Sequence, residues 1–187
     1  LEVGEVITAT EPSVVFHLAT HFTAKHEPSE ISAMLDSNVT YGTAVAQACA
    51  DSGARLVHVT SAWQHLGGAA YEPVSLYAAT KQALVDIVRY FEIAEGLDAR
   101  EVCLFDTYGS DDDRGKLVSA LITHAGSGRV MQMSSGRQLV DLTHIDDIVA
   151  ALINAGGQES WDERLVARSN RPVTIRELVA EVERATG

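Results

Sequence analysis

The chain has 187 residues, of which 46% are hydrophobic and 21% charged, the composition of a globular domain with an apolar core. Fourteen lysines and arginines against 26 aspartates and glutamates give a formal net charge of −12, which disfavours binding to nucleic acid or anionic membranes. The sequence has no apolar run of about 18 residues and no signal-peptide pattern. We therefore expect a cytoplasmic protein that binds neither nucleic acid nor membrane.

The first hundred residues alternate between short apolar runs and longer amphipathic stretches, after a start at Leu1 inside what reads as a helix. Three apolar runs rich in β-branched residues predict strands, and the first is expected to be buried on both faces. These strands cover residues 13–19, 55–60 and 100–105. Apolar residues at helical spacing predict helices over residues 29–52 and 75–95. The order strand, helix, strand, helix, strand predicts a parallel sheet with right-handed crossovers.

The remaining residues are less regular. A capping box of Thr174 and Glu177 predicts the start of the last helix. The other predicted elements are helices over 116–125 and 145–155, short strands over 129–133 and 165–167, and an extended segment over 138–142.

Tyr77 and Lys81 lie four residues apart, so a helix places them on one face. An ammonium beside a phenol favours the phenolate and is expected to lower the pKa of the tyrosine from about 10 toward neutrality. Thr60 and Ser61 end the second predicted strand, at the sheet edge where doubly wound folds bind ligands. The spacing of tyrosine and lysine also occurs by chance on many helices, so the pair alone does not define an active site.

The order of these features along the chain favours an active site over a chance spacing of tyrosine and lysine. A strand ending in Thr60-Ser61, a loop, and then Tyr77-Ala-Ala-Thr-Lys81 at the start of a helix together resemble the extended branch of the short-chain dehydrogenase/reductases, the NAD-dependent epimerase/dehydratase family. Further segments that match this family are His17-Leu18-Ala19-Thr20, Asn38 with Gly42-Thr43, Phe105-Asp106-Thr107-Tyr108-Gly109, and Leu142-Thr143-His144-Ile145-Asp146-Asp147.

The resemblance implies a Rossmann-like doubly wound parallel sheet and a small C-terminal substrate-binding region. Residues 1–110 would form a partial dinucleotide-binding domain, and 111–187 mainly the substrate-binding region, with 138–155 returning to the sheet. The glycine-rich turn that holds the pyrophosphate in this family is missing, so we expect the chain to be part of a longer protein. The residue that would select NAD or NADP is missing with it, and both cofactors stay open.

The strings TSAWQH (60–65), EPVSLYAATKQA (72–83) and SSGRQLVDL (134–142) are similar to the abequose and paratose synthase group, which reduces nucleotide-linked 4-keto deoxysugars. This resemblance implies NAD(P)-dependent reduction of the C4 ketone of a 4-keto-6-deoxysugar. Tyr77 would be the general acid/base and Ser61 would hydrogen-bond the reacting oxygen. Lys81 would hold the nicotinamide ribose and tune the tyrosine.

The same resemblance implies two sets of binding residues and no metal. Trp63 would flank the sugar, although packing of a loop aromatic explains it equally well. The implied dinucleotide contacts are Leu18, Ala19, Thr20, Asn38, Thr60, Tyr77, Lys81, Phe105 and Thr107. The implied contacts to a nucleotide-diphosphate deoxysugar are Ser61, Trp63, Asp106, Arg114 and Lys116.

Ketoreduction has three alternatives. Ala62 and Trp63 follow Ser61 where 4,6-dehydratases carry an Asp-Glu pair, which argues against dehydration. Val140 stands where many 4-epimerases carry an arginine, which weakens epimerisation with the same three residues without excluding it. A non-catalytic dinucleotide-binding scaffold or sensor is the third alternative. The two long helices are apolar enough to permit the homodimer that is common in the family.

Overall fold

The structure is a computed structural model that describes residues 2–65, 68, 70–110, 112, 115–127, 130–159 and 164–186. Its contacts divide the chain into two compact units. The first comprises Leu1–Leu104 and Ala150–Val166, and the second comprises Phe105–Val149 and Ala167–Gly187. The functional boundary near residue 110 stays a prediction. Within the described residues, no helix has the length and apolar character needed to cross a membrane.

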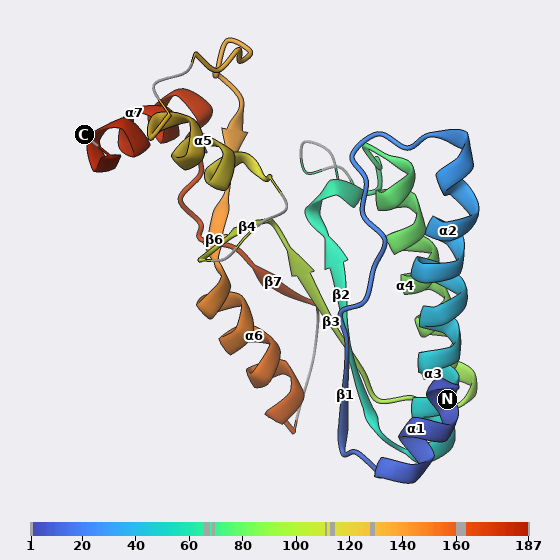
Figure 1. The fold of residues 1–187 in the computed structure, drawn as a ribbon. Coiled ribbons are helices and arrows are strands. Elements are labelled where there is room, and N and C mark those ends of the chain that lie inside the picture. Colours follow the sequence, from blue (N-terminus) through green and yellow to red (C-terminus); the bar gives the residue numbers. More distant parts are fainter. Residues whose placement is uncertain are drawn as a thin grey trace. The chain divides into compact units, whose positions relative to one another are not determined.

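A four-stranded sheet in the order β1-β2-β3-β7 organises the first unit (Figure 1). The strands are β1 (Val14–His17), β2 (Arg55–Ser61), β3 (Ala99–Leu104) and β7 (Leu165–Ala167). β2 pairs in parallel with both β1 and β3. Parallel neighbours need crossover connections, which the helices between them supply. The predicted α/β fold with a parallel sheet is therefore confirmed.

Helices cover both faces of this sheet (Figure 1). They are α1 (Val3–Thr10), α2 (Ile31–Leu35), α3 (Tyr41–Ser52), α4 (Leu76–Ala94) and the later part of α6 (Ile145–Gly157), with short 3₁₀ turns η1 (Pro28–Glu30) and η3 (Ala62–Gln64). The helix predicted over 29–52 is present, but a π-helical turn, η2 (Asp36–Thr40), joins α2 to α3. A π-helical turn is rare in helices and frequently marks a functional position.

Buried residues of α1, α3, α4 and the strands form one apolar core.

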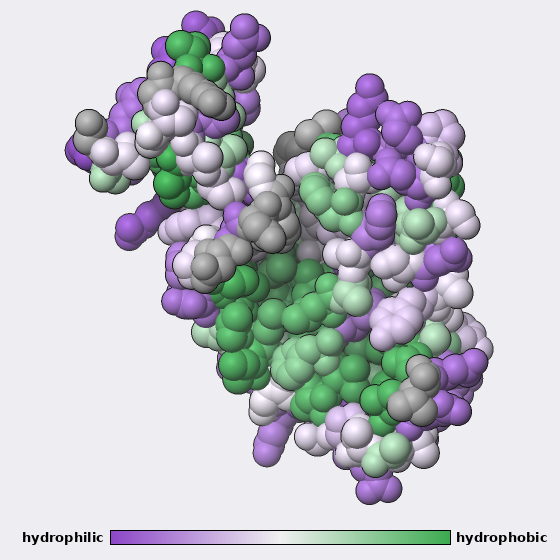
Figure 2. Space-filling model, viewed as in Figure 1, coloured by the Kyte–Doolittle hydropathy of each residue, from purple (hydrophilic) through white to green (hydrophobic). Residues whose placement is uncertain are grey.

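Alternation along β1 sends its side chains to opposite faces. Val15 packs against the core under α3 and α4, whereas Phe16 lies on the face toward Gly156 of α6. Phe16 is 42% exposed, so the prediction of a strand buried on both faces is wrong, because α6 covers this face of β1 only in part. Figure 2 shows apolar side chains gathered over the strands and α6 on this side, and the exposed ones include Phe16 and Ile153.

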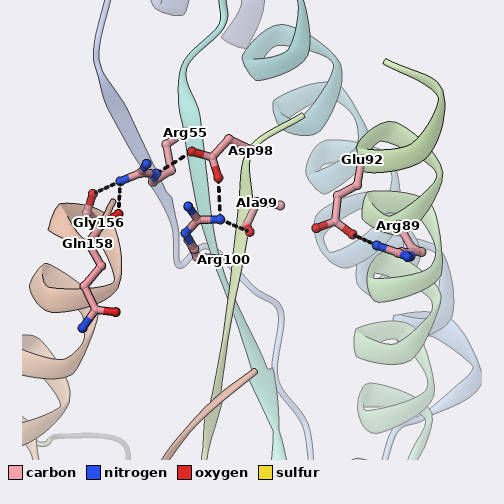
Figure 3. A network of polar contacts seen from close by, with 8 residues as sticks. All are labelled: Arg55, Arg89, Glu92, Asp98, Ala99, Arg100, Gly156 and Gln158. Atoms are coloured by element: carbon pink, nitrogen blue, oxygen red, sulfur yellow. Dashed lines mark hydrogen bonds and ion pairs between the residues drawn. The ribbon is translucent and has the colours of Figure 1, made fainter. Parts of the chain in front are cut away.

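A cluster of charged residues connects the end of α6, in the segment Ala150–Val166 of the first unit, to the sheet (Figure 3). Arg55 at the start of β2 forms an ion pair of 2.7 Å with Asp98, which also pairs with Arg100. The other end of the Arg55 guanidinium donates to the carbonyls of Gly156 and Gln158, both at 2.8 Å. These carbonyls lie at the end of α6, where a cation is stabilising. Arg55 therefore joins residues about one hundred positions apart in sequence.

The second unit contains two small sheets and packed helices. The parallel pair is β4 (Asp106–Tyr108) with β6 (Leu142–His144), the antiparallel pair is β5 (Leu139–Val140) with β8 (Val173–Thr174), and α5 (Leu117–Ala125) packs against α7 (Ile175–Thr186). The capping box is confirmed, since Thr174 and Glu177 exchange side-chain and backbone hydrogen bonds. The strand predicted over 129–133 is wrong for residues 130–133, where Val130 is 92% exposed and gains no burial, while Arg129 lies outside the described residues.

Candidate active site

Helix α4 carries Tyr77 and Lys81 in its first turns, after an N-cap in which the Ser75 hydroxyl accepts a hydrogen bond from Ala78. Lys81 is 3% exposed, and its Nζ donates to the carbonyl of Val59 at 3.1 Å. The same Nζ lies 5.9 Å from the ring centroid of Tyr77. Burial lowers the pKa of Lys81 to about 8, so this ammonium is still mostly charged at neutral pH. The helix thus holds a buried cation between the tyrosine and the end of β2.

Tyr77 differs from the sequence-based expectation. Burial raises the pKa of its phenol above the ordinary value of 10, although a side-chain hydrogen bond with Thr20 opposes the shift. The expected fall toward neutrality is therefore wrong for this structure, because removing the phenolate from water outweighs the attraction of a cation several ångströms away. Tyr77 is a protonated phenol at neutral pH, which is the form needed to donate a proton.

The turn after β2 fixes Ser61 to the same helix. The Ser61 hydroxyl accepts from the backbone N–H of Trp63 at 3.2 Å, and its own N–H donates to Oε1 of Gln64 at 2.8 Å. Gln64 is 1% exposed and donates through Nε2 to Gln82 of α4 at 2.9 Å. Because the Ser61 hydroxyl is an acceptor in its bond with Trp63, its O–H can still donate to another oxygen.

Asn38 in the π-helical turn is 1% exposed and uses its whole amide group within the protein. Its Oδ1 accepts from the Thr20 hydroxyl at 2.9 Å and from the N–H of His21 at 2.7 Å. Its Nδ2 donates to the carbonyl of His21 and to the hydroxyl of Thr80, both at 3.0 Å. Asn38 thereby ties the loop after β1 to the turn of α4 that carries Tyr77 and Lys81.

An aromatic group stands at the same site. The ring centroid of Phe22 lies 4.9 Å from that of Tyr77 and 5.6 Å from that of Trp63, both in edge-on arrangements. Phe22 is 45% exposed, so this aromatic group is not closed off within the described first unit. Its three members come from the loop after β1, the turn after β2, and α4.

A row of polar residues crosses the sheet behind Lys81. The strand register aligns His17 of β1, His58 of β2 and Glu101 of β3, and both histidines are buried. Burial, and then the charge of Lys81, lowers the pKa of His17 to about 4. Burial, Lys81 and His17 lower the pKa of His58 to about 3. Both imidazoles are therefore neutral at pH 7. The Thr60 hydroxyl donates a hydrogen bond to Oε1 of Glu101 at 2.8 Å.

The predicted binding residues divide between the units. The first unit contains Leu18, Ala19, Thr20, Asn38, Thr60, Ser61, Trp63, Tyr77 and Lys81. Of these, Thr20, Asn38, Trp63, Tyr77 and Lys81 are joined by the contacts described above. Phe105, Asp106, Thr107 and Lys116 belong to the second unit. There Arg168 lies 5.1 Å from the centroid of Phe105 and pairs with the buried Asp141. Arg114 lies outside the described residues.

Sequence reasoning did not single out Phe22, Gln64 or His58. Gln64 had a readable signal, because Ser61-Ala-Trp-Gln64 has the spacing of a capping box. Phe22 stands two residues after the family-like segment that ends at Thr20, in a loop at the carboxyl edge of the sheet. His58 had no signal, since a histidine within an apolar strand does not show which buried groups it will meet.

These features define the class as a Rossmann-like α/β fold in which a helix carries a tyrosine and, one turn later, a buried lysine, and in which a serine ends strand β2. The chain belongs to the NAD dependent epimerase/dehydratase family, whose model matches residues 2–161. The resemblance described from the sequence is thereby confirmed.

Two relatives of known activity match at modest identity. A CDP-abequose synthase of Yersinia pseudotuberculosis is 25% identical over 129 residues, which are 67% of this chain and 45% of that protein. A UDP-glucose 4-epimerase of Mycolicibacterium smegmatis is 27% identical over 195 residues, covering 95% of this chain and 61% of that protein. The chain therefore spans about half to three-fifths of the length of these relatives.

Solved structures agree with the fold. MoeE5 in complex with UDP-glucose and NAD superposes with a TM-score of 0.85 at 26% identity, over all of this chain and 66% of that one. UDP-glucuronic acid 4-epimerase of Bacillus cereus superposes with a TM-score of 0.91 at 15% identity, over all of this chain and 63% of that one. The predicted Rossmann-like fold is confirmed.

Proposed function

We propose that this chain carries the catalytic residues of an enzyme that uses NAD or NADP to reduce the C4 ketone of a nucleotide-linked 4-keto-6-deoxysugar. The observation that carries the proposal is a half-buried Tyr77, kept in its protonated form, whose ring centroid lies 5.9 Å from Nζ of the buried Lys81. A ketone reduction begins with a proton donor of this kind. The similarity to a CDP-abequose synthase and the nucleotide sugars in the MoeE5 structures support this substrate class.

The described residues include hydrogen-bond donors that fit a nicotinamide dinucleotide. Lys81 has three N–H groups and uses one on Val59, so two are left for ribose hydroxyls. Thr20, Thr60, Leu18 and Ala19 lie at the carboxyl edge of the sheet, where such ligands bind. Asn38 would act through Thr20 and the loop it holds, and Phe105 and Thr107 would add contacts from the second unit. The bound cofactor supplies the hydride.

The chain's own residues would complete the reaction. C4 gains the hydride, its oxygen takes the proton of Tyr77, and the ketone becomes a secondary alcohol. Ser61 would donate a hydrogen bond to the same oxygen as negative charge develops. The Lys81 ammonium would stabilise the phenolate that Tyr77 becomes.

The net charge of −12 requires local cations for an anionic substrate. We assign Lys116 and Arg114 to the diphosphate, for which lysine and the arginine fork are suited. Asp106 and Trp63 would contact the sugar. We also propose a homodimer formed through the two long helices, as the sequence resemblance implies.

The test is a turnover assay on the whole protein with a nucleotide 4-keto-6-deoxysugar and reduced cofactor. The wild type should oxidise NADH or NADPH in proportion to the alcohol formed. Tyr77→Phe should reduce kcat by about 10²- to 10⁴-fold, because it removes the proton donor and keeps the ring. Tyr90→Phe removes an exposed hydroxyl of the same helix and should leave turnover unchanged. Normal turnover by the Tyr77 variant would refute the assignment.

Epimerisation at C4 is the second candidate, favoured by a match to a UDP-glucose 4-epimerase that extends over 95% of this chain. An epimerase regenerates its cofactor in every cycle, whereas a reductase consumes it. The same assay therefore separates them. Interconversion of two C4 epimers with no net loss of reduced cofactor would establish the epimerase.

A further inference from the structure

We propose that Phe22, together with Trp63, forms an apolar subsite that selects a methyl group at C6 of the sugar over a hydroxymethyl group or a carboxylate. The inference rests on the proposed function, because it takes the reacting C4 to lie at Tyr77. It adds a specificity-determining residue, Phe22, to the site.

The geometry places Phe22 against the proton donor. Its ring centroid lies 4.9 Å from that of Tyr77, and the side chain is 45% exposed. The ring centroid of Trp63, which follows Ser61 by two residues, lies 5.6 Å from that of Phe22. A sugar whose C4 oxygen reaches Tyr77 and Ser61 therefore has this aromatic pair beside it.

The loop that carries Phe22 is anchored. Asn38 bonds the hydroxyl of Thr20 and both backbone groups of His21, the residue immediately before Phe22. Two of these bonds hold the backbone of the residue next to Phe22, and the third holds the Thr20 side chain. Because the backbone beside it is held, the Phe22 ring can move aside only by rotating its own side chain, which would give up its edge-on contacts with Tyr77 and Trp63.

The ring of Phe22 favours an apolar substituent at C6 over a polar one. C6 is attached to C5, the carbon next to C4, so its substituent lies close to the reacting centre. The ring of Phe22 offers no hydrogen-bond partner, and a hydroxyl placed on it would lose its bonds to water. A closed hydrophobic site discriminates against an added hydroxyl by up to about 10², and the partly exposed Phe22 should give about 10- to 100-fold. A carboxylate would lose more, because a charge is costlier to desolvate than a hydroxyl.

The experiment measures kcat/KM in the oxidation direction for two nucleotide sugars that differ only at C6, one with a methyl and one with a hydroxymethyl group. In this direction C4 gives its hydride to the oxidised cofactor and its hydroxyl proton to the phenolate form of Tyr77, which a raised assay pH populates equally for both sugars. The wild type should prefer the 6-deoxy sugar by about 10- to 100-fold. Phe22→Ser should reduce this preference at least about fivefold, whereas Phe22→Leu, which stays apolar, should largely keep it.

Tyr90→Ser is the matched control, because it removes an exposed aromatic ring of α4 that lies 13 residues beyond Tyr77, about 20 Å along the helix. It should leave the ratio of the two kcat/KM values unchanged. An equal kcat/KM for both sugars in the wild type, or a preference that survives in Phe22→Ser, overturns the inference while the proposed reductase stands. Failure to oxidise either sugar would instead overturn the proposed function, and the inference with it.

Discussion

At the scale of single residues, burial rather than pairing controls the ionisation of the site. Lys81 illustrates this, since its pKa is lowered to about 8 by burial from 10.5. The unfolded chain therefore binds more protons between these values, and the free energy of unfolding should rise as pH increases from about 8 to 10.5. Lys81→Met should lose this rise. Chemical denaturation across this pH range measures it, and an identical slope in the variant would contradict the buried ammonium.

His58 and His17 give the corresponding prediction in acid. In the folded protein burial lowers the pKa of His58 to about 3 and that of His17 to about 4, whereas the ordinary pKa of a histidine is 6.5. The unfolded state takes up protons first, so stability should be complete above pH 6.5 and fall as pH drops toward 3. His58→Gln should reduce the slope of the free energy of unfolding in this window. If the slope is the same in both proteins, His58 does not titrate as the structure indicates.

At the scale of elements, the contact between α3 and α4 positions the site helix. Gly42 of α3 faces Leu84 of α4 so closely that an added Cβ would lie 2.7 Å from a Leu84 methyl and 3.2 Å from Nε2 of His17. Gly42→Ala should destabilise the protein by about 1–3 kcal/mol, because the close-packed helices must separate. It should also lower kcat, since α4 carries Tyr77 and Lys81.

The control for this prediction is Gly4→Ala in α1, where an added Cβ meets nothing within 4 Å. Relief of glycine's flexibility in a helix should make that variant neutral or more stable by up to about 1 kcal/mol. Thermal unfolding of both variants tests the pair. Equal changes in Tm would show that the helix contact does not require a glycine.

At the scale of the whole molecule, the first unit depends on joining distant parts of the chain. Arg55 links β2 to Asp98 and to the carbonyls at the end of α6 (Figure 3). Arg55→Met should cost about 1–3 kcal/mol, because Asp98 and two carbonyls lose a charged partner. Hydrogen exchange should also quicken in the last turns of α6.

Arg89 supplies the comparison, because its ion pair with Glu92 lies on the surface of α4 and its side chain is 67% exposed (Figure 3). Surface pairs of this kind contribute little, so Arg89→Met should change the free energy of unfolding by less than about 0.5 kcal/mol. Similar losses in both variants would show that the Arg55 contacts are no stronger than a surface pair.

The sequence by itself determined the order of the main strands and helices of the first unit and the pairing of Tyr77 with Lys81. These are local properties, set by the spacing of apolar residues along the chain and by the pitch of a helix. The short strands β4 and β8 were not predicted, because two or three residues carry too little periodicity to reveal them. The exposed face of β1 was also missed, since how fully a helix covers a strand is not encoded in the strand's own residues.

Only the tertiary structure decided the chemistry around the pair. The raised pKa of Tyr77, the buried Lys81 on the Val59 carbonyl and the position of Phe22 all depend on groups that are distant in sequence. Desolvation is a property of the surroundings, and a linear pattern of residues does not specify which surroundings a phenol or an ammonium will have. The motif thus indicated the candidate site, and the packing of β1, β2 and α4 determined its protonation state.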